Sequence, residues 1–148
     1  MGASRRGLLL ASGGLLSLTL SRRAYATPEM LKEALHEFAG EAEIEEGAIT
    51  LDVPPLVENG NVVPLTVTVE SPMTETDHVV EIALFNERNP QPHVARFQLG
   101  PRSGRATVGM RMRLATSQRV TAVARLSDGR FIGTGAEVIV TLAACIES

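Results

Sequence analysis

The 148-residue chain changes its hydrophobic pattern near residue 44. From there to residue 144, apolar and polar positions alternate in short runs, as in strands that bury one face. Sequences typical of turns separate the runs, among them the segments 58–61 and 127–130. About seven such runs predict an all-β sandwich that forms one domain. The runs are residues 48–53, 64–70, 78–87, 94–100, 107–114, 119–126 and 137–144.

Residues 27–40 show a helical pattern instead. Thr27 is suited to cap a helix, Pro28 suits its first turn, and Gly40 suits the position just after its end. We expect one N-terminal helix that packs against an edge of the sandwich, and a helix that binds a partner is the alternative. Its apolar stripe consists of Met30, Leu31, Ala34, Leu35 and Phe38.

The first 26 residues match the pattern of an export signal peptide. Arg5 and Arg6 precede an uncharged stretch at 7–21, and Ala24-Tyr25-Ala26 fits the small-x-small pattern of a cleavage site. The uncharged stretch is shorter than the roughly 20 residues of a membrane span. An uncleaved membrane anchor is the alternative interpretation.

The basic part of this leader resembles a twin-arginine signal, in which two arginines precede an apolar stretch. Leu8 and Leu10 stand where Phe and Lys are usual in such signals. The resemblance implies export of an already folded protein to the periplasm. We therefore expect a signal peptide at 1–26, a β-sandwich domain at 27–142 and a flexible C-terminal arm at 143–148.

The predicted mature chain is acidic. The whole sequence has 14 basic and 17 acidic side chains, and residues 1–26 contain four of the arginines and no acidic residue. Removing them leaves 10 basic side chains against 17 acidic ones, a net charge of −7. This charge argues against nucleic acid or an anionic membrane as a partner.

Few residues outside the arm suggest chemistry. His36, His78 and His93 lie in different predicted elements, without the spacing of a metal site. Met110 and Met112 raise the possibility of copper binding together with the cysteine, although their alternation is more typical of a buried strand face. The segment 100–105 has the composition of an anion-binding turn or, more simply, of a solvated loop. We find no motif of a nucleotide-binding or catalytic site.

Cys145 is the only cysteine, and three residues follow it. A single cysteine cannot form an internal disulfide, and a position so near the terminus leaves little chain to bury it. The thiol lacks a surrounding set of catalytic groups but is well placed to carry a group into a partner's active site. Glu147 would raise the pKa of the thiol, so its activation has to come from the partner.

Together these segments resemble the SoxY family of sulfur carriers in thiosulfate oxidation. The resemblance lies in residues 58–79, 82–131 and 138–145, in that order. It implies an immunoglobulin-like sandwich that pairs with a SoxZ-like subunit, and a role as a carrier without a catalytic site or bound cofactor. It further implies that Cys145 carries sulfur intermediates covalently, which periplasmic enzymes of sulfur oxidation load, hydrolyse and oxidise.

The arm departs from the family pattern, in which glycines flank the cysteine on both sides. Here Ala143 and Ala144 precede Cys145, and Ile146 and Glu147 follow it, so the arm is bulkier and less free in its backbone. It is more similar to SoxY-related proteins with the arm sequence AACIE. Two further hypotheses stay open: a sandwich whose arm docks into a partner without covalent cargo, and a copper-handling protein.

Overall fold

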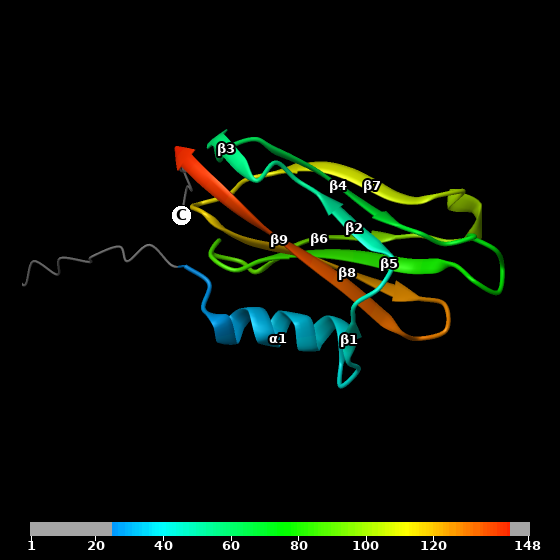
Figure 1. Cartoon of the computed structure of the whole chain (residues 1–148). Helices are drawn as coiled ribbons and strands as arrows, with labels where there is room; N and C mark the ends of the chain where they lie inside the picture. The colour runs from blue at the N-terminus through cyan, green and yellow to red at the C-terminus, as the bar shows by residue number, and fades with distance from the viewer. Residues whose placement is uncertain (1–24, 143–148) are drawn as a thin grey trace, which may run out of the picture.

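The alternating runs fold into two β-sheets packed face to face, and the segment before them forms one helix (Figure 1). This computed structural model describes residues 25–142. Within that range the elements are α1 (Pro28–Ala39), β1 (Ile44–Glu45), β2 (Ile49–Asp52), β3 (Leu56–Asn59), β4 (Val63–Val69), β5 (Val79–Asn86), β6 (His93–Gln98), β7 (Ala106–Met112), β8 (Gln118–Leu126) and β9 (Phe131–Leu142), with a short 3₁₀ turn at Pro101–Ser103.

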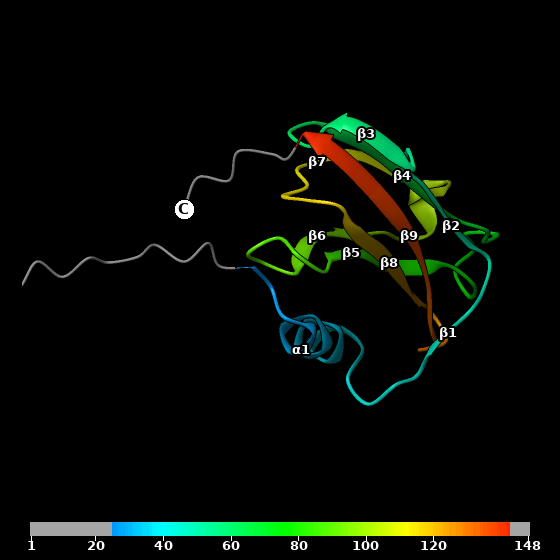
Figure 2. The same ribbon diagram turned by 60° about the vertical axis from the view of Figure 1, so that its left-hand side comes forward.

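The larger sheet has the strand order β1-β9-β8-β5-β6, and β3 pairs with the far end of β9. The smaller sheet has the order β2-β4-β7 and is antiparallel throughout. The apolar residues of the alternating runs meet between the sheets, where Val63, Val67, Ile82, Leu84 and Val120 are completely buried. The predicted all-β sandwich is therefore confirmed, and Figure 2 shows the two layers from another side.

Helix α1 begins and ends where its capping residues predict. The Thr27 hydroxyl accepts a hydrogen bond from the Met30 N–H at 3.3 Å, and Gly40 closes the helix with a positive φ of 63°. Its N–H donates to the His36 carbonyl at 2.7 Å. Met30 does not belong to the packed stripe: it lies in the first turn and is exposed.

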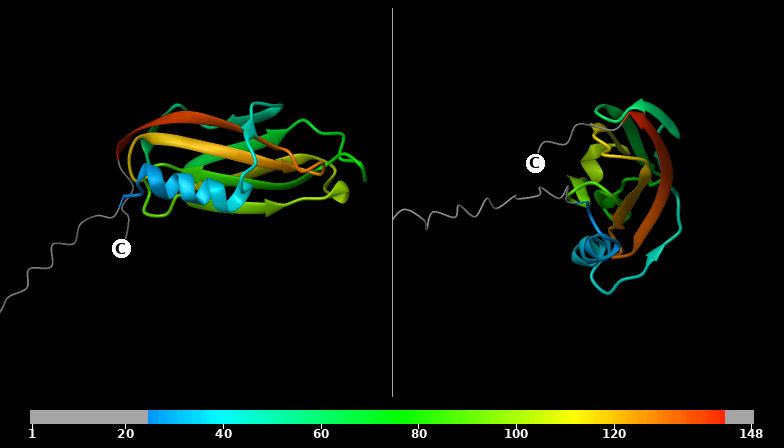
Figure 3. Two further views of the ribbon diagram at one scale, coloured as in Figure 1. Left: turned by 90° about the horizontal axis from the view of Figure 1, so that it is seen from below. Right: turned by 90° about the vertical axis from the view of Figure 1, so that its left-hand side faces the viewer.

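The helix covers a face of the larger sheet, so its predicted position at an edge is wrong (Figure 3). Phe38 packs edge-on against Phe85 of β5 at 5.9 Å and against Phe131 of β9 at 5.6 Å between ring centroids. Ala83 and Val123 complete this second, smaller core. The helix lies over central strands because their outward residues are apolar there and need cover.

The largest differences from the sequence prediction are the early start of β9 and two short strands, β1 and β3, that were not predicted. Strand β9 begins at Phe131 instead of residue 137, because Gly133 and Gly135 interrupt the alternation without ending the strand. A Cβ on Gly133 would lie 2.7 Å from Cγ2 of Ile44, so the close approach of β1 requires glycine there. The short strands β1 and β3 both pair in parallel with β9, and the turn predicted at 58–61 is confined to residues 60–61.

Candidate functional site

The predicted carrier cysteine lies beyond the described residues, as do its neighbours Ala143, Ala144, Ile146 and Glu147. Strand β9 ends at Leu142, the last described residue, and Cys145 follows three residues later in the sequence. The site is therefore built outward from the end of β9. What the structure defines is the base from which the arm starts.

Strand β3 holds that base in place. Leu56, Val57 and Asn59 lie opposite Ile139, Val140 and Leu142 in parallel register. At the very end of the strand, the Gly60 N–H donates to the Leu142 carbonyl at 2.9 Å. The Gly60 carbonyl in turn accepts from the Leu114 N–H at 2.8 Å. The last residue before the arm is thus tied through the turn after β3 to the segment after β7.

The Ser117 side chain fixes β9 from the other side. Its hydroxyl accepts a hydrogen bond from the Val140 N–H at 2.8 Å and donates to the Val140 carbonyl at 3.4 Å. Strand β8 begins one residue later, so β9 is bonded here to a segment outside the regular ladder. The base of the arm is therefore anchored on both sides of β9.

A partly buried polar network keeps the Ser117 segment in position. The Asn89 side-chain oxygen accepts from the Ala115 N–H at 2.9 Å and from the Gln118 side-chain amide at 2.8 Å. The Asn89 amide donates to the Arg113 carbonyl at 2.7 Å. The Gln118 oxygen accepts from the Arg88 N–H at 2.9 Å, which ties the loop after β5 to the same network. Sequence reasoning missed it because these residues appear in the sequence as ordinary loop residues.

Large apolar side chains are exposed around this base. Four of the six large apolar side chains exposed in residues 25–142 belong to β3, to the turn after it or to the end of β9. Leu56 and Ile139 are direct neighbours in the parallel pair. We name these four residues the apolar collar: Leu56, Val62, Ile139 and Leu142.

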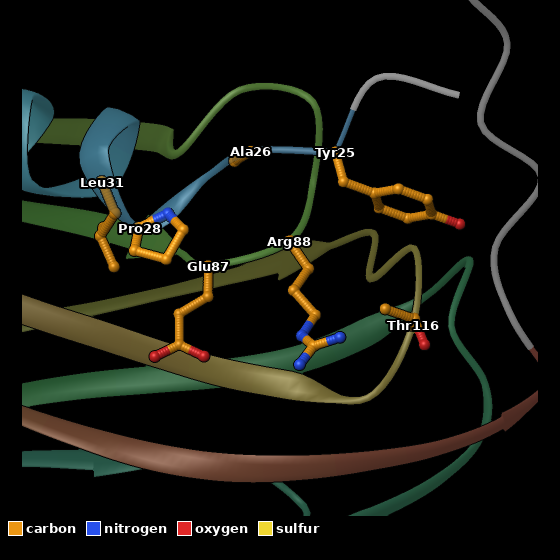
Figure 4. A pocket seen from close by; sticks show the side chains of 7 residues that line it. All are labelled: Tyr25, Ala26, Pro28, Leu31, Glu87, Arg88 and Thr116. Carbon is orange, nitrogen blue, oxygen red and sulfur yellow. The ribbon is translucent and has the colours of Figure 1, made fainter. Parts of the chain in front are cut away.

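A cleft of about 510 Å³ lies beside the N-terminal end of α1 (Figure 4). Thr116, next to Ser117, lines one wall, and the exposed side chain of Arg88 lies between Glu87 and Thr116 in this view. The predicted signal peptide includes the wall residues Tyr25 and Ala26, so we assign no role to this cleft. The lining residues are Tyr25, Ala26, Pro28, Leu31, Glu87, Arg88 and Thr116.

The three histidines make different contacts. His36 Nε2 lies 3.6 Å from Glu41 Oε1, and His78 Nδ1 lies 3.0 Å from the Thr74 carbonyl oxygen. His93 Nε2 accepts a hydrogen bond from Arg96 Nε at 3.0 Å. Burial lowers the pKa of His93, and the charge of Arg96 lowers it further, while Glu37 and Glu81 oppose the shift. Residues 25–142 contain no cluster of three or more His, Asp and Glu side chains suited to a metal ion.

The two methionines lie in the sandwich core or against it. Met112 is buried, and Met110 packs against the core cluster from a partly exposed position. The copper hypothesis required both to be exposed, and Met112 does not meet that requirement. The segment 100–105 forms a 3₁₀ turn with exposed Arg102 and Arg105, as expected of a solvated loop.

No helix in the described part of the chain is long and apolar enough to cross a membrane. The fold and the cysteine together define a class: a two-sheet sandwich whose last described strand is followed, three residues later in the sequence, by the only cysteine. The family model described as "Sulfur oxidation protein SoxY" matches residues 35–145, and the chain belongs to this family. The match extends through the whole described sandwich and up to the cysteine. No curated protein matches the sequence closely enough to add to this assignment.

Solved structures agree with the family assignment. The sulfur carrier protein SoxY from Chlorobium limicola f thiosulfatophilum matches with 31% identity and a TM-score of 0.65, over 77% of this chain and 98% of its own. A superoxide reductase (neelaredoxin) from Ignicoccus hospitalis matches with 17% identity and a TM-score of 0.57, over 78% and 94%. A superoxide reductase from Nanoarchaeum equitans matches with 13% identity and a TM-score of 0.55, over 65% and 100%. The two reductases show only that the sandwich fold is shared.

Proposed function

We propose that this protein is a periplasmic sulfur carrier that holds sulfur intermediates covalently on Cys145. The observation that carries the proposal is the position of the only cysteine, three residues beyond an anchored strand end, in a chain whose family match runs to residue 145. The likeness to a solved sulfur carrier protein supports it. A thiol three residues beyond a strand end, without neighbouring catalytic groups in sequence, is suited to carry a chemical group to an enzyme.

The chemistry of such a carrier starts from the Cys145 thiolate, the nucleophilic form of a cysteine. With a persulfide donor, R–S–SH, the thiolate attacks the outer sulfur, a new S–S bond forms at Cys145, and the donor leaves as R–S⁻. This transfer needs no oxidant. With thiosulfate, conversion of the Cys145 thiol into the adduct Cys145–S–S–SO₃⁻, in which the first sulfur is that of the cysteine, releases one proton and two electrons overall. An electron-accepting partner enzyme has to take up the two electrons.

The arm sequence bears on which cargo is used. Alanine and isoleucine beside Cys145 restrict the backbone and widen the tip relative to a glycine-flanked arm. An active-site channel shaped for a slimmer arm would exclude Ile146 by steric overlap. We therefore propose sulfur intermediates as the class of cargo, with the enzymes of this pathway differing in channel width from those that accept glycine arms.

A SoxZ-like subunit is the proposed partner of the sandwich, and the twin-arginine-like leader is the proposed export route. Both follow from the family and from the leader sequence at 1–26. A folded complex exported together would need only one signal sequence. The carrier itself is proposed to have no catalytic centre, since loading, hydrolysis and oxidation belong to its partner enzymes.

Intact-mass analysis of the protein from its native host tests the proposal. Cells supplied with thiosulfate or sulfide should contain protein whose mass is raised by one or more sulfur atoms, and dithiothreitol should remove the increase. Because Cys145 is the only cysteine, the Cys145→Ser variant is a matched control and should show no reducible adduct. An unmodified wild-type protein, together with undiminished sulfur oxidation in Cys145→Ser cells, would favour the sandwich that docks without covalent cargo.

A further inference from the structure

The short distance between Cys145 and the sandwich limits how a partner enzyme can reach the thiol. An extended chain spans at most about 3.3–3.6 Å per residue, so the three steps from Leu142 to Cys145 cover about 10 Å. An enzyme that encloses the thiol in its active site has to bring the entrance of that site to within this distance of Leu142. Residues around the end of β9 therefore face the entrance during every reaction on the arm.

The residues that meet this requirement are those of the apolar collar. Leu56 is 59% exposed and Ile139 57%, and they lie opposite each other in adjacent strands on the outer side of the sheet. Leu142, at the start of the arm, is 63% exposed. Val62 is 56% exposed and follows the turn in which the Gly60 N–H donates to the Leu142 carbonyl. Figure 1 shows β3 beside the end of β9, as the register requires. Because Ile139 and Leu142 are three positions apart in β9, they point to opposite faces of the strand, so the apolar collar surrounds the strand end and is not confined to one face. Exposed apolar side chains around one strand end are typical of an interaction surface.

The sequence around the apolar collar is also poor in charge. Glu58 is the only charged residue in 53–69, and 138–142 contains none. Elsewhere the surface is strongly charged, for example in α1 and the segment after it, where Glu29, Lys32, Glu33, Glu37 and Glu41 are exposed. Depletion of charge at the centre of a surface is the compositional mark of a protein interface.

The collar is supported by an ordered backbone. The Ile139 N–H donates to the Pro55 carbonyl at 2.9 Å, and the Thr141 hydroxyl donates to the Glu58 carbonyl at 3.3 Å. Together with the bonds of Gly60 and Ser117, these contacts fix both strands that present the apolar side chains. A surface already held in place loses little conformational freedom on binding.

We propose that the apolar collar is the docking surface for the apolar rim around the active-site entrance of the enzymes that act on Cys145. This inference rests on the proposed carrier function and adds the surface that partner enzymes recognise. A subunit that is permanently bound to the collar would block the approach of each enzyme to Cys145. We therefore place the SoxZ-like subunit elsewhere on the sandwich.

A double variant, Leu56→Asp with Ile139→Asp, tests the proposal in the full chain produced in its native host. Both side chains are more than half exposed, so neither carboxylate has to be buried, and the two carboxylates oppose an apolar rim. The matched control is Thr50→Asp with Thr107→Asp, which adds the same charge at exposed positions of the smaller sheet. Thr50 of β2 and Thr107 of β7 both lie opposite Thr68, near the end of β4 that is farther from Val62. Far-ultraviolet circular dichroism and thermal unfolding verify that both variants are folded.

The readout is the rate at which the sulfur adduct on Cys145 appears after thiosulfate or sulfide is added to the cells, and disappears after it is withdrawn. We expect both rates to fall at least about tenfold in the collar variant, in line with loss of central interface contacts. The control should keep the wild-type rates. Reaction of Cys145 with Ellman's reagent should be equally fast in all three proteins, because a small reagent needs no docking surface.

Adduct turnover at the wild-type rate in the collar variant would overturn the docking proposal and leave the carrier function standing. A collar variant that loses its SoxZ-like subunit, or a wild-type dimer that the variant abolishes, would show that the collar is a stable subunit interface, which also overturns the proposal. A wild-type protein that never acquires an adduct would instead refute the carrier function on which the inference rests.

Discussion

The two ends of β9 place apolar side chains on the same outer face of the larger sheet but in opposite surroundings. At the start of the strand, Phe131 is buried beneath α1 and in contact with Phe38. At the end, Ile139 projects from the same face and is mostly exposed. Between them Gly133 and Gly135 have no side chain, and Glu137 pairs with Arg119 at 3.3 Å.

This difference separates what an apolar residue does for stability from what it does for binding. The covered end of β9 contributes to a second core, with aromatic rings from a helix and two strands. The open end leaves its apolar surface in water beside the start of the arm, which costs free energy that only a bound partner recovers. The proposed docking surface therefore consists of apolar residues like those of a core, but they are exposed in the described part of the chain.

Replacing Phe38 by alanine should have the largest effect on stability. Its ring fills the space between α1 and the larger sheet, so Phe38→Ala should lower the free energy of unfolding by about 3–5 kcal/mol. Ile139→Ala, at the open end, should lower it by less than about 1 kcal/mol, because the side chain is already largely in water. Urea denaturation of both variants measures the difference.

Equal losses in the two variants would contradict the comparison. A large loss at Ile139 would mean that its side chain is covered in solution, for example by a second copy of the chain. Measuring both variants over a range of protein concentrations distinguishes these cases, since a self-association effect depends on concentration.

The glycines in the middle of β9 should differ in their tolerance of a methyl group. A Cβ on Gly133 meets Ile44, which packs in the core beneath α1, and also approaches the Ala122 carbonyl oxygen at 3.4 Å. We expect Gly133→Ala to cost about 1–3 kcal/mol, as overpacking does. The loss should appear in the urea midpoint, with the slope of the transition unchanged.

Gly135→Ala is the matched control for this effect. The three atoms nearest to its Cβ all belong to the guanidinium group of Arg119, whose side chain is exposed and free to swing away. The ion pair to Glu137 would be lost, at a cost of about 0.2–1 kcal/mol, and alanine would restrict the unfolded chain in compensation. A Gly135→Ala variant as unstable as Gly133→Ala would show that strand β9 resists any side chain here, irrespective of β1.

Much of this fold can be predicted from local signals. Thr27, Pro28 and Gly40 define the ends of α1 through contacts within a few residues. The alternation is uninterrupted in β4 and is broken in β8 only by Val123, and both strands lie close to their expected bounds. Strands β1 and β3 cannot be predicted from local signals, because each forms only by pairing with β9, which is distant in the sequence.

The site divides in the same way. The position of Cys145 can be read from the sequence, and its role as carrier stays a prediction because the residue lies outside the described range. The apolar collar cannot be found in the sequence, since Leu56 and Ile139 become neighbours only through the parallel pairing of β3 with β9. Their exposure depends on where α1 stops covering the sheet, which the sequence pattern of the helix alone does not determine.

The smallest predicted effect concerns pH and distinguishes the covered side of the larger sheet from the open end. His93 packs edge-on against Phe85, with 5.5 Å between ring centroids, and accepts a hydrogen bond from Arg96. Arg96 also lies over Phe38 at 5.3 Å and pairs with Glu37 at 3.9 Å. Protonating His93 would turn its Nε2 from an acceptor into a donor that faces the Arg96 guanidinium.

The direction of the pH effect follows from the lowered pKa of His93, for which burial is the main cause and the Arg96 charge the second. Below the ordinary histidine value of about 6.5, the unfolded chain binds this proton more readily than the folded protein does. The contribution of neutral His93 is therefore complete above that value and is lost as the pH falls toward the lowered pKa. Between about pH 7.5 and about pH 5.5, urea denaturation should show a smaller loss of stability in His93→Gln than in the wild type. Titration of the His93 ring by NMR gives the sign directly, and a value above the ordinary one would show that protonation stabilises the helix-covered side and that the predicted sign is wrong.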